Sequence, residues 1–107
     1  MRHSGSWQSV WDDRILEWLR ENGGTGSAKQ IHDSDMLRIS KPHISRRFGK
    51  LKENGLVVDL GNGVYQITEE GRGYLDEEYD VDRGVWLDRD QAEEDGPSAG
   101  ATSENGV

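Results

Sequence analysis

The hydrophobic pattern of the chain is clearest between Ser40 and Gly55, and the neighbouring segments can be arranged around this stretch. Its apolar residues follow the spacing i, i+4 and i+7 of one helix face: Ile44, Phe48 and Leu51. This spacing predicts an amphipathic helix that buries one side. Ser40 is a suitable N-cap, and Pro42 is tolerated because the first turn has no intrahelical donor to lose. The pair Asn54-Gly55 predicts the C-terminal end of the helix.

The polar side of this predicted helix is basic. His43, Arg46, Arg47 and Lys50 recur at i, i+3, i+4 and i+7, with Arg46 and Lys50 most nearly opposite the apolar positions. Exposed cationic side chains often only solvate a helix. Here, however, they stand in a chain of net charge −8, and five of its 13 basic residues fall in this one segment. The distribution of charge favours a DNA-recognition helix.

Two shorter segments before the basic helix carry helix-start signals. Ser9 with Asp12 forms an S-x-x-D capping box and predicts a helix over 10–22, which ends at consecutive glycines. Ser27 with Gln30 forms an S-x-x-Q box and predicts a short helix over 28–33, after a loop at Thr25-Gly26. A turn containing Met36, Leu37 and Ile39 follows. The short helix, turn and basic helix together predict a helix-turn-helix.

After Gly55 the period of the pattern changes from 3.6 to 2, which predicts two strands over 56–60 and 64–68. Asn62-Gly63 favours a two-residue hairpin turn, in which Leu60 pairs with Tyr65 and Val58 with Ile67 on one apolar face. Thr68 then predicts the cap of a last helix, extending from Glu69 to about Tyr79. The expected fold class is mainly α with a small β-hairpin (α+β), arranged as a winged helix-turn-helix.

The composition changes after Tyr79. Residues 80–107 hold eight acids and two arginines, a net charge of −6, whereas residues 1–79 have a net charge of −2. We therefore expect a DNA-binding domain over 1–79 and an acidic, largely disordered tail over 80–107. Val85-Trp86-Leu87 is an apolar exception that could dock on the domain or on a partner. The acidic excess also suits a protein that stays hydrated in concentrated salt.

Several chemistries find no support in the sequence. With no cysteine there is no disulfide, thiol catalysis or cysteine-based zinc site. His32, Asp33 and Asp35 lack a second histidine at metal-ligand spacing and are expected to be surface residues. No phosphate-binding loop or catalytic constellation is visible, so we expect no enzyme, cofactor or metal. The absence of a signal peptide and of a long apolar run predicts a cytoplasmic protein without a membrane span.

Three segments carry a family resemblance: Ser40 to Arg47, Asn54-Gly55-Leu56-Val57, and Gly63 to Gly71. Together with Trp11 to Glu17 they resemble the winged-helix regulators of halophilic archaea. That group includes proteins similar to the phage phiH repressor and is broadly related to the MarR and ArsR regulators. The resemblance covers about residues 7–79 and implies that Ser45, Arg46, Arg47 and Lys50 face DNA. The predicted wing tip departs from the basic wing pattern, since Gly61-Asn62-Gly63 contains no Arg or Lys.

These observations favour a sequence-specific regulator of transcription, in the first place a repressor, that binds double-stranded DNA as a homodimer. The expected DNA-binding residues are Lys41, His43, Ser45, Arg46, Arg47, Lys50 and Asn62. Asn62 is first a turn residue and only secondarily a backbone contact. The alternative is a winged-helix module that binds another protein through its acidic surface or tail. RNA binding is the third interpretation, but no aromatic stacking platform is visible.

Overall fold

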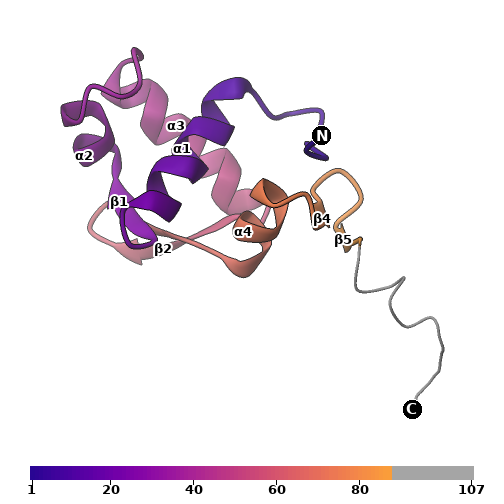
Figure 1. The fold of residues 1–107 in the computed structure, drawn as a ribbon. Coiled ribbons are helices and arrows are strands. Elements are labelled where there is room, and N and C mark those ends of the chain that lie inside the picture. Colours follow the sequence, from indigo (N-terminus) through magenta and orange to yellow (C-terminus); the bar gives the residue numbers. More distant parts are fainter. Residues whose placement is uncertain (88–107) are drawn as a thin grey trace, which may run out of the picture.

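The fold is a winged helix, which the computed structural model describes for residues 1–87 (Figure 1). The elements in chain order are α1 (Val10–Glu21), β1 (Thr25–Ser27), α2 (Ala28–Asp33), α3 (Lys41–Glu53), β2 (Val57–Gly61), β3 (Val64–Ile67), α4 (Glu69–Leu75), β4 (Tyr79–Asp80) and β5 (Val85–Trp86). The predicted fold class is confirmed. Residues 88–107 of the predicted tail lie outside the described residues.

The core lies between the helices and the inner face of the sheet. Ile31 of α2 is fully buried in it, as are six residues from the apolar faces of α1 and α3: Ile15, Leu16, Leu19, Ile44, Phe48 and Leu51. Leu56, Val57 and Ile67 add the sheet side, and Tyr74 and Leu75 of α4 close the far end. Trp7, Trp11 and Trp18 are half-buried and pack against this cluster, so these three rings extend the core.

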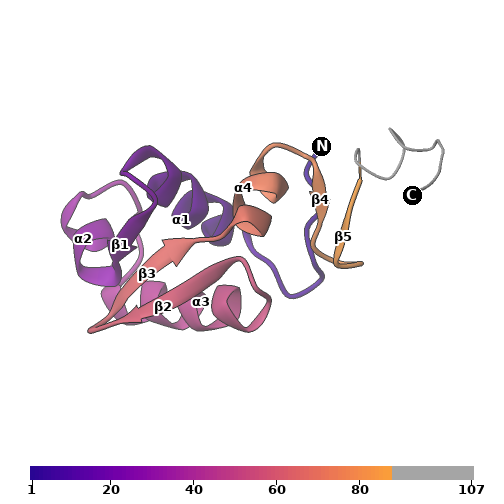
Figure 2. The same ribbon diagram turned by 90° about the horizontal axis from the view of Figure 1, so that it is seen from below.

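The sheet contains a strand that the sequence does not reveal. Thr25-Gly26, expected as a loop, belongs to β1, which pairs antiparallel with β3, so the strand order is β1-β3-β2. Only Thr25 of this three-residue segment favours a strand, whereas glycine is required at position 26 because a Cβ there would collide with the Trp18 ring. The pairing of Ser27 with Val64 places the start of α2 beside the β2–β3 hairpin (Figure 2).

The β2–β3 hairpin turns where predicted, but its predicted register is wrong. Gly61 pairs with Val64 across Asn62-Gly63, and both turn residues have positive φ, 56° and 77°. A bulge between Asp59 and Gly61 then pairs Asp59 with Tyr65 and Val57 with Ile67. The Gly61 N–H donates to the Asp59 carboxylate at 2.7 Å, a local bond that favours the bulge over a regular ladder. The bulge turns Val58 and Leu60 to solvent and buries Val57.

The last predicted helix is too long. Thr68 caps α4 as expected, accepting a hydrogen bond from Gly71 N at 3.0 Å, but α4 ends at Leu75. Glu77 has φ 65°, which turns the chain into β4. Tyr79 and Trp86 pair across β4–β5 with ring centroids 4.9 Å apart. Thus the segment 79–87, which includes Val85-Trp86-Leu87, docks back on the domain instead of entering the tail.

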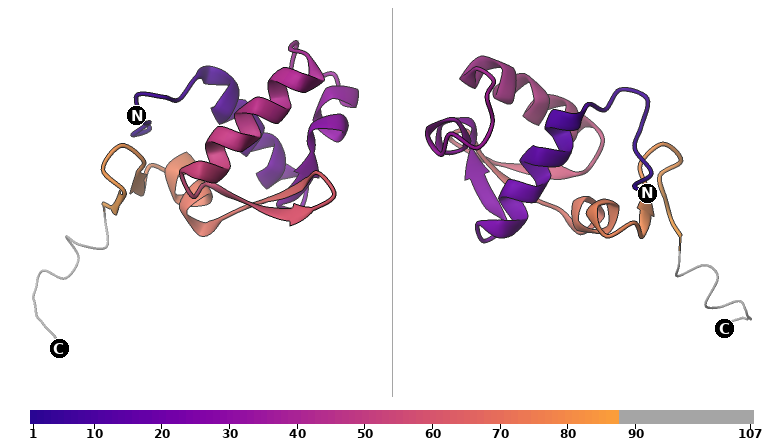
Figure 3. Two further views of the ribbon diagram at one scale, coloured as in Figure 1. Left: turned by 180° about the vertical axis from the view of Figure 1, so that it is seen from behind. Right: turned by 45° about the horizontal axis from the view of Figure 1, so that its top comes forward.

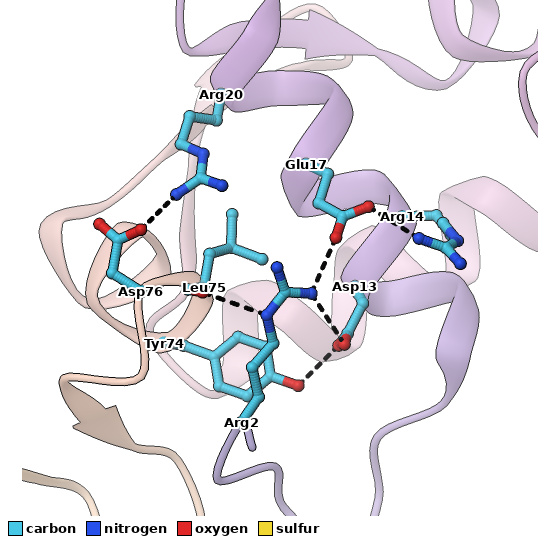
Figure 4. A network of polar contacts seen from close by, with 8 residues as sticks. All are labelled: Arg2, Asp13, Arg14, Glu17, Arg20, Tyr74, Leu75 and Asp76. Atoms are coloured by element: carbon cyan, nitrogen blue, oxygen red, sulfur yellow. Dashed lines mark hydrogen bonds and ion pairs between the residues drawn. The ribbon is translucent and has the colours of Figure 1, made fainter.

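A polar network fastens the N-terminal segment to α1 and α4 (Figure 4). The Arg2 guanidinium donates to Glu17 at 2.8 Å, to Asp13 at 3.3 Å and to the Leu75 carbonyl at 3.1 Å. The Tyr74 hydroxyl donates to Asp13 at 2.6 Å. Burial, followed by this hydrogen bond, raises the pKa of Tyr74, so the hydroxyl stays protonated as a donor. The first residues therefore lie beside β4 and α4 (Figures 1 and 2), and are part of the fold.

Candidate nucleic-acid interface

The basic helix forms as the sequence predicts. The Ser40 hydroxyl accepts a hydrogen bond from the His43 N–H at 3.2 Å, and Pro42 occupies the first turn. The helix ends at Asn54, whose backbone N–H bonds the carbonyls of Lys50 and Leu51. Ile44, Phe48 and Leu51 are fully buried against the core, which leaves the opposite side of α3 exposed (Figure 3, left).

The exposed side of α3 carries a shallow hollow. Four of the predicted DNA-binding residues line it, together with Gly49 and Glu53: His43, Arg46, Arg47 and Lys50. Arg46 and Lys50 are exposed, and His43 is half-buried. Lys50 lies 3.7 Å from Glu53, and this exposed pair is weak because solvent screens it.

A separate groove lies beside α3 and contains the other predicted contacts. Lys41 and Ser45 of α3 line it together with Asn62 at the wing tip. The full lining is Ser27, Ala28, Lys29, Lys41, Ser45, Asn62, Gly63 and Tyr65. The wing is held against α3 by the Tyr65 ring, which stacks on Phe48 with centroids 4.3 Å apart. The groove thus joins α2, α3 and the wing.

Lys29 is a groove residue that sequence reasoning missed. It comes from α2, and only the pairing of β1 with β3 places it near the wing. Its ammonium group forms an exposed ion pair with Asp33 at 2.7 Å. The sequence indicates the position of Lys29 only through the capping box at Ser27, which locates the first turn of α2.

Arg47 lines the same hollow, but its guanidinium is already bound within the fold. Its guanidinium donates two hydrogen bonds to the Asp12 carboxylate, from Nε at 2.8 Å and from Nη2 at 2.7 Å. Nη2 also donates to the Trp7 carbonyl at 3.1 Å. The Asp12 side chain is fully buried, and the Arg47 side chain is 18% exposed. The hydrogen bonds to Asp12 raise the pKa of Arg47 against the opposing effect of burial. Arg47 therefore ties α3 to α1, and its charge is already compensated.

The cations of this surface differ in whether they have a partner. Arg47, Lys50 and Lys52 of α3 each lie within 4 Å of a carboxylate, at 2.7, 3.7 and 3.8 Å. By contrast, Arg38, Lys41 and Arg46 form no ion pair with any carboxylate of residues 1–87. The uncompensated charge of this region therefore lies on α3 and on the turn before it.

Other types of site receive no support in the described part of the chain. No group of three His, Asp or Glu side chains among residues 1–87 could hold a metal ion. In the same residues, no helix is long and apolar enough to cross a membrane.

Comparison with known proteins gives one informative similarity. The sequence matches no protein-family model and no curated protein. The chain is similar, at 52% sequence identity and a TM-score of 0.77, to the crystal structure of the PhiH1 repressor-like protein from Haloarcula marismortui. The similarity covers 81% of this chain and 98% of that one, so it includes nearly the whole of the relative.

Proposed function

We propose that this chain, which belongs to the family of PhiH1 repressor-like proteins, is a transcriptional regulator that binds double-stranded DNA through α3. The family supports a regulatory, non-enzymatic role. The observation that carries the proposal is the uncompensated positive charge of Lys41 and Arg46 on the exposed side of α3, in a chain of net charge −8. The broader relation to the MarR and ArsR regulators stays a prediction.

In the proposed complex, the start and the middle of α3 bind different parts of the DNA. Lys41 at the start of α3 holds a phosphate, since the helix N-terminus carries partial positive charge. Arg46 reads guanine in the major groove, where its guanidinium can donate two hydrogen bonds to one base. His43, Ser45 and Lys50 divide the remaining base and phosphate contacts, whereas Arg47 is engaged with Asp12.

The wing takes a smaller part. Its tip offers Asn62 and two glycines but no cation, so deep insertion into the minor groove has no electrostatic support. Asn62 lies in one groove with Lys41 and Ser45, which favours a contact with the DNA backbone. One helix and a wing without cations offer little sequence specificity. We therefore propose a homodimer that binds a two-fold symmetric site and represses by occupying the DNA in the cytoplasm.

The test is a selection of duplexes from a random-sequence pool with the full chain, at low and at molar potassium chloride. We expect a sequence motif with two-fold symmetry, and an affinity that falls with rising salt because cations of the protein replace counterions of DNA. Arg46→Gln should bind the selected duplex weakly. Enrichment of no duplex at either salt concentration would reject the proposal.

A further inference from the structure

Three glycines lie inside helices of this domain, and intramolecular packing explains two of them. A Cβ at Gly71 would lie 2.5 Å from the Leu56 carbonyl oxygen and 2.7 Å from Ile67 Cγ1, and a Cβ at Gly73 would collide with the Trp86 ring. Glycine destabilises a helix interior relative to alanine, because it loses more backbone entropy on folding. At these two positions close packing requires it.

Gly49 has no such explanation. It lies in the middle of α3, its φ is not positive, and a Cβ built there would have nothing within 4 Å. The fold therefore accepts alanine at position 49 and would gain helix stability from it. The missing side chain instead shapes the surface, because Gly49 lines the hollow on α3 together with Arg46, Lys50 and Glu53.

We infer that Gly49 is the place where a DNA strand lies closest to the backbone of α3. This inference rests on the proposed function and adds a contact to it. An α-helix with its side chains is about as wide as the major groove, so a bare backbone position lets the helix lie deeper. The first turns of a recognition helix face the bases, and Gly49 is the ninth of the 13 residues of α3. At that position the helix passes the sugar–phosphate edge of the groove, and Lys50 beside it takes a phosphate.

One substitution, Gly49→Ala, should raise the stability of the domain and lower its affinity for DNA. Gly49→Ala should raise the thermal midpoint by about 4 °C, because alanine is the better helix former. The same variant should bind the duplex selected by the wild-type protein about tenfold more weakly, since the added methyl group pushes the strand away. Gly49→Gln, with a longer neutral side chain, should bind more weakly still.

Salt titrations separate this steric effect from loss of charge. Neither Gly49 variant removes a cation, so the slope of affinity against salt should stay that of the wild type. Lys50→Gln, the matched control from the same hollow, should reduce that slope by about one. Wild-type affinity for Gly49→Ala, together with weak binding by Arg46→Gln, would overturn the inference and leave the proposed function standing. A lower thermal midpoint for Gly49→Ala would overturn it as well, because position 49 would not then be open. If the wild type itself selects no duplex, both fail.

Discussion

Two groups of basic side chains in this molecule have opposite surroundings. Around Arg2, the basic and acidic groups of the N-terminal segment, α1 and α4 pair with one another (Figure 4): Arg2 with Asp13 and Glu17, Arg14 with Glu17, and Arg20 with Asp76. On the exposed side of α3, Lys41 and Arg46 have no carboxylate partner within residues 1–87. The first group holds elements together, whereas the charge of the second is not used within residues 1–87.

Arg46 and Arg47 show this difference within one pair of neighbours. The helix places them about 100° apart, so Arg46 points to solvent while Arg47 reaches the buried Asp12. A count of basic residues treats the two alike. Whether the folded protein already supplies a partner is therefore a better guide to a nucleic-acid surface than the number of cations.

The largest expected effect comes from breaking the pair of Arg47 and Asp12. Arg47→Gln leaves a fully buried carboxylate without its cation, and Asp12→Asn leaves the guanidinium without its anion. Each should lower the free energy of unfolding by roughly 3–5 kcal/mol, measured by urea denaturation. Arg46→Gln is the matched control and should change it by less than about 0.5 kcal/mol. A stable Arg47→Gln variant with a reduced salt dependence of DNA binding would instead make Arg47 a phosphate contact.

The next effect concerns binding. Arg46→Ala should weaken binding to the selected duplex by about 1–3 kcal/mol, because it removes a base contact. Its thermal midpoint should stay near that of the wild type, since the side chain is exposed and unpaired in residues 1–87. Normal binding by Arg46→Ala, measured by fluorescence anisotropy, would show that this side of α3 does not read DNA.

The paired group should respond to pH. Burial raises the pKa of Glu17, but hydrogen bonds and charge from Arg2 and Arg14 outweigh it and hold this pKa below its ordinary value of 4.5. Because the folded-state pKa is the lower one, the stabilisation is present above pH 4.5 and is lost as the pH falls through the folded-state value. Arg2→Ala should therefore cost about 1 kcal/mol of unfolding free energy at neutral pH.

Below the folded-state pKa of Glu17 the difference between Arg2→Ala and wild type should shrink, because both proteins then lack the ion pair. Urea denaturation at neutral pH and at a series of decreasing acidic pH values measures this change. A difference that does not change with pH would mean that the contacts of Arg2 with Asp13 and the Leu75 carbonyl, and not its ion pair with Glu17, stabilise the domain.

Local signals were sufficient to predict most of the helices. The apolar periods and four capping residues locate α1, α2, α3 and the start of α4. The capping residues are Ser9, Ser27, Ser40 and Thr68. The features that the sequence does not reveal depend on contacts distant in the chain. β1 is a strand only because β3 pairs with it, and α4 ends early because Trp86 and Tyr79 form a second hairpin. The register of the wing depends on one local hydrogen bond, which the Gly61 N–H donates to the Asp59 carboxylate.

The candidate site follows the same rule. The amphipathic pattern of α3 correctly separates its buried and exposed sides, and Arg46 is exposed as expected. The partner of Arg47, however, lies 35 residues earlier in the chain, at a position that also serves the capping box of α1. Helical spacing carries no information about such a partner.

The smallest expected effect on binding comes from substituting Asn62. This residue forms the hairpin turn and is also a candidate contact with DNA. Its φ of 56° is in the left-handed region, which alanine resists, so Asn62→Ala should destabilise the domain by about 1 kcal/mol. Asn62→Gly is the matched control, because it also removes the side chain but accepts positive φ. If Asn62 is only a turn residue, both variants should bind the selected duplex within about twofold of wild type, and only the alanine variant should unfold at lower urea. Weak binding by the stable glycine variant would show instead that the Asn62 side chain contacts DNA, and that a wing without cations still takes part in recognition.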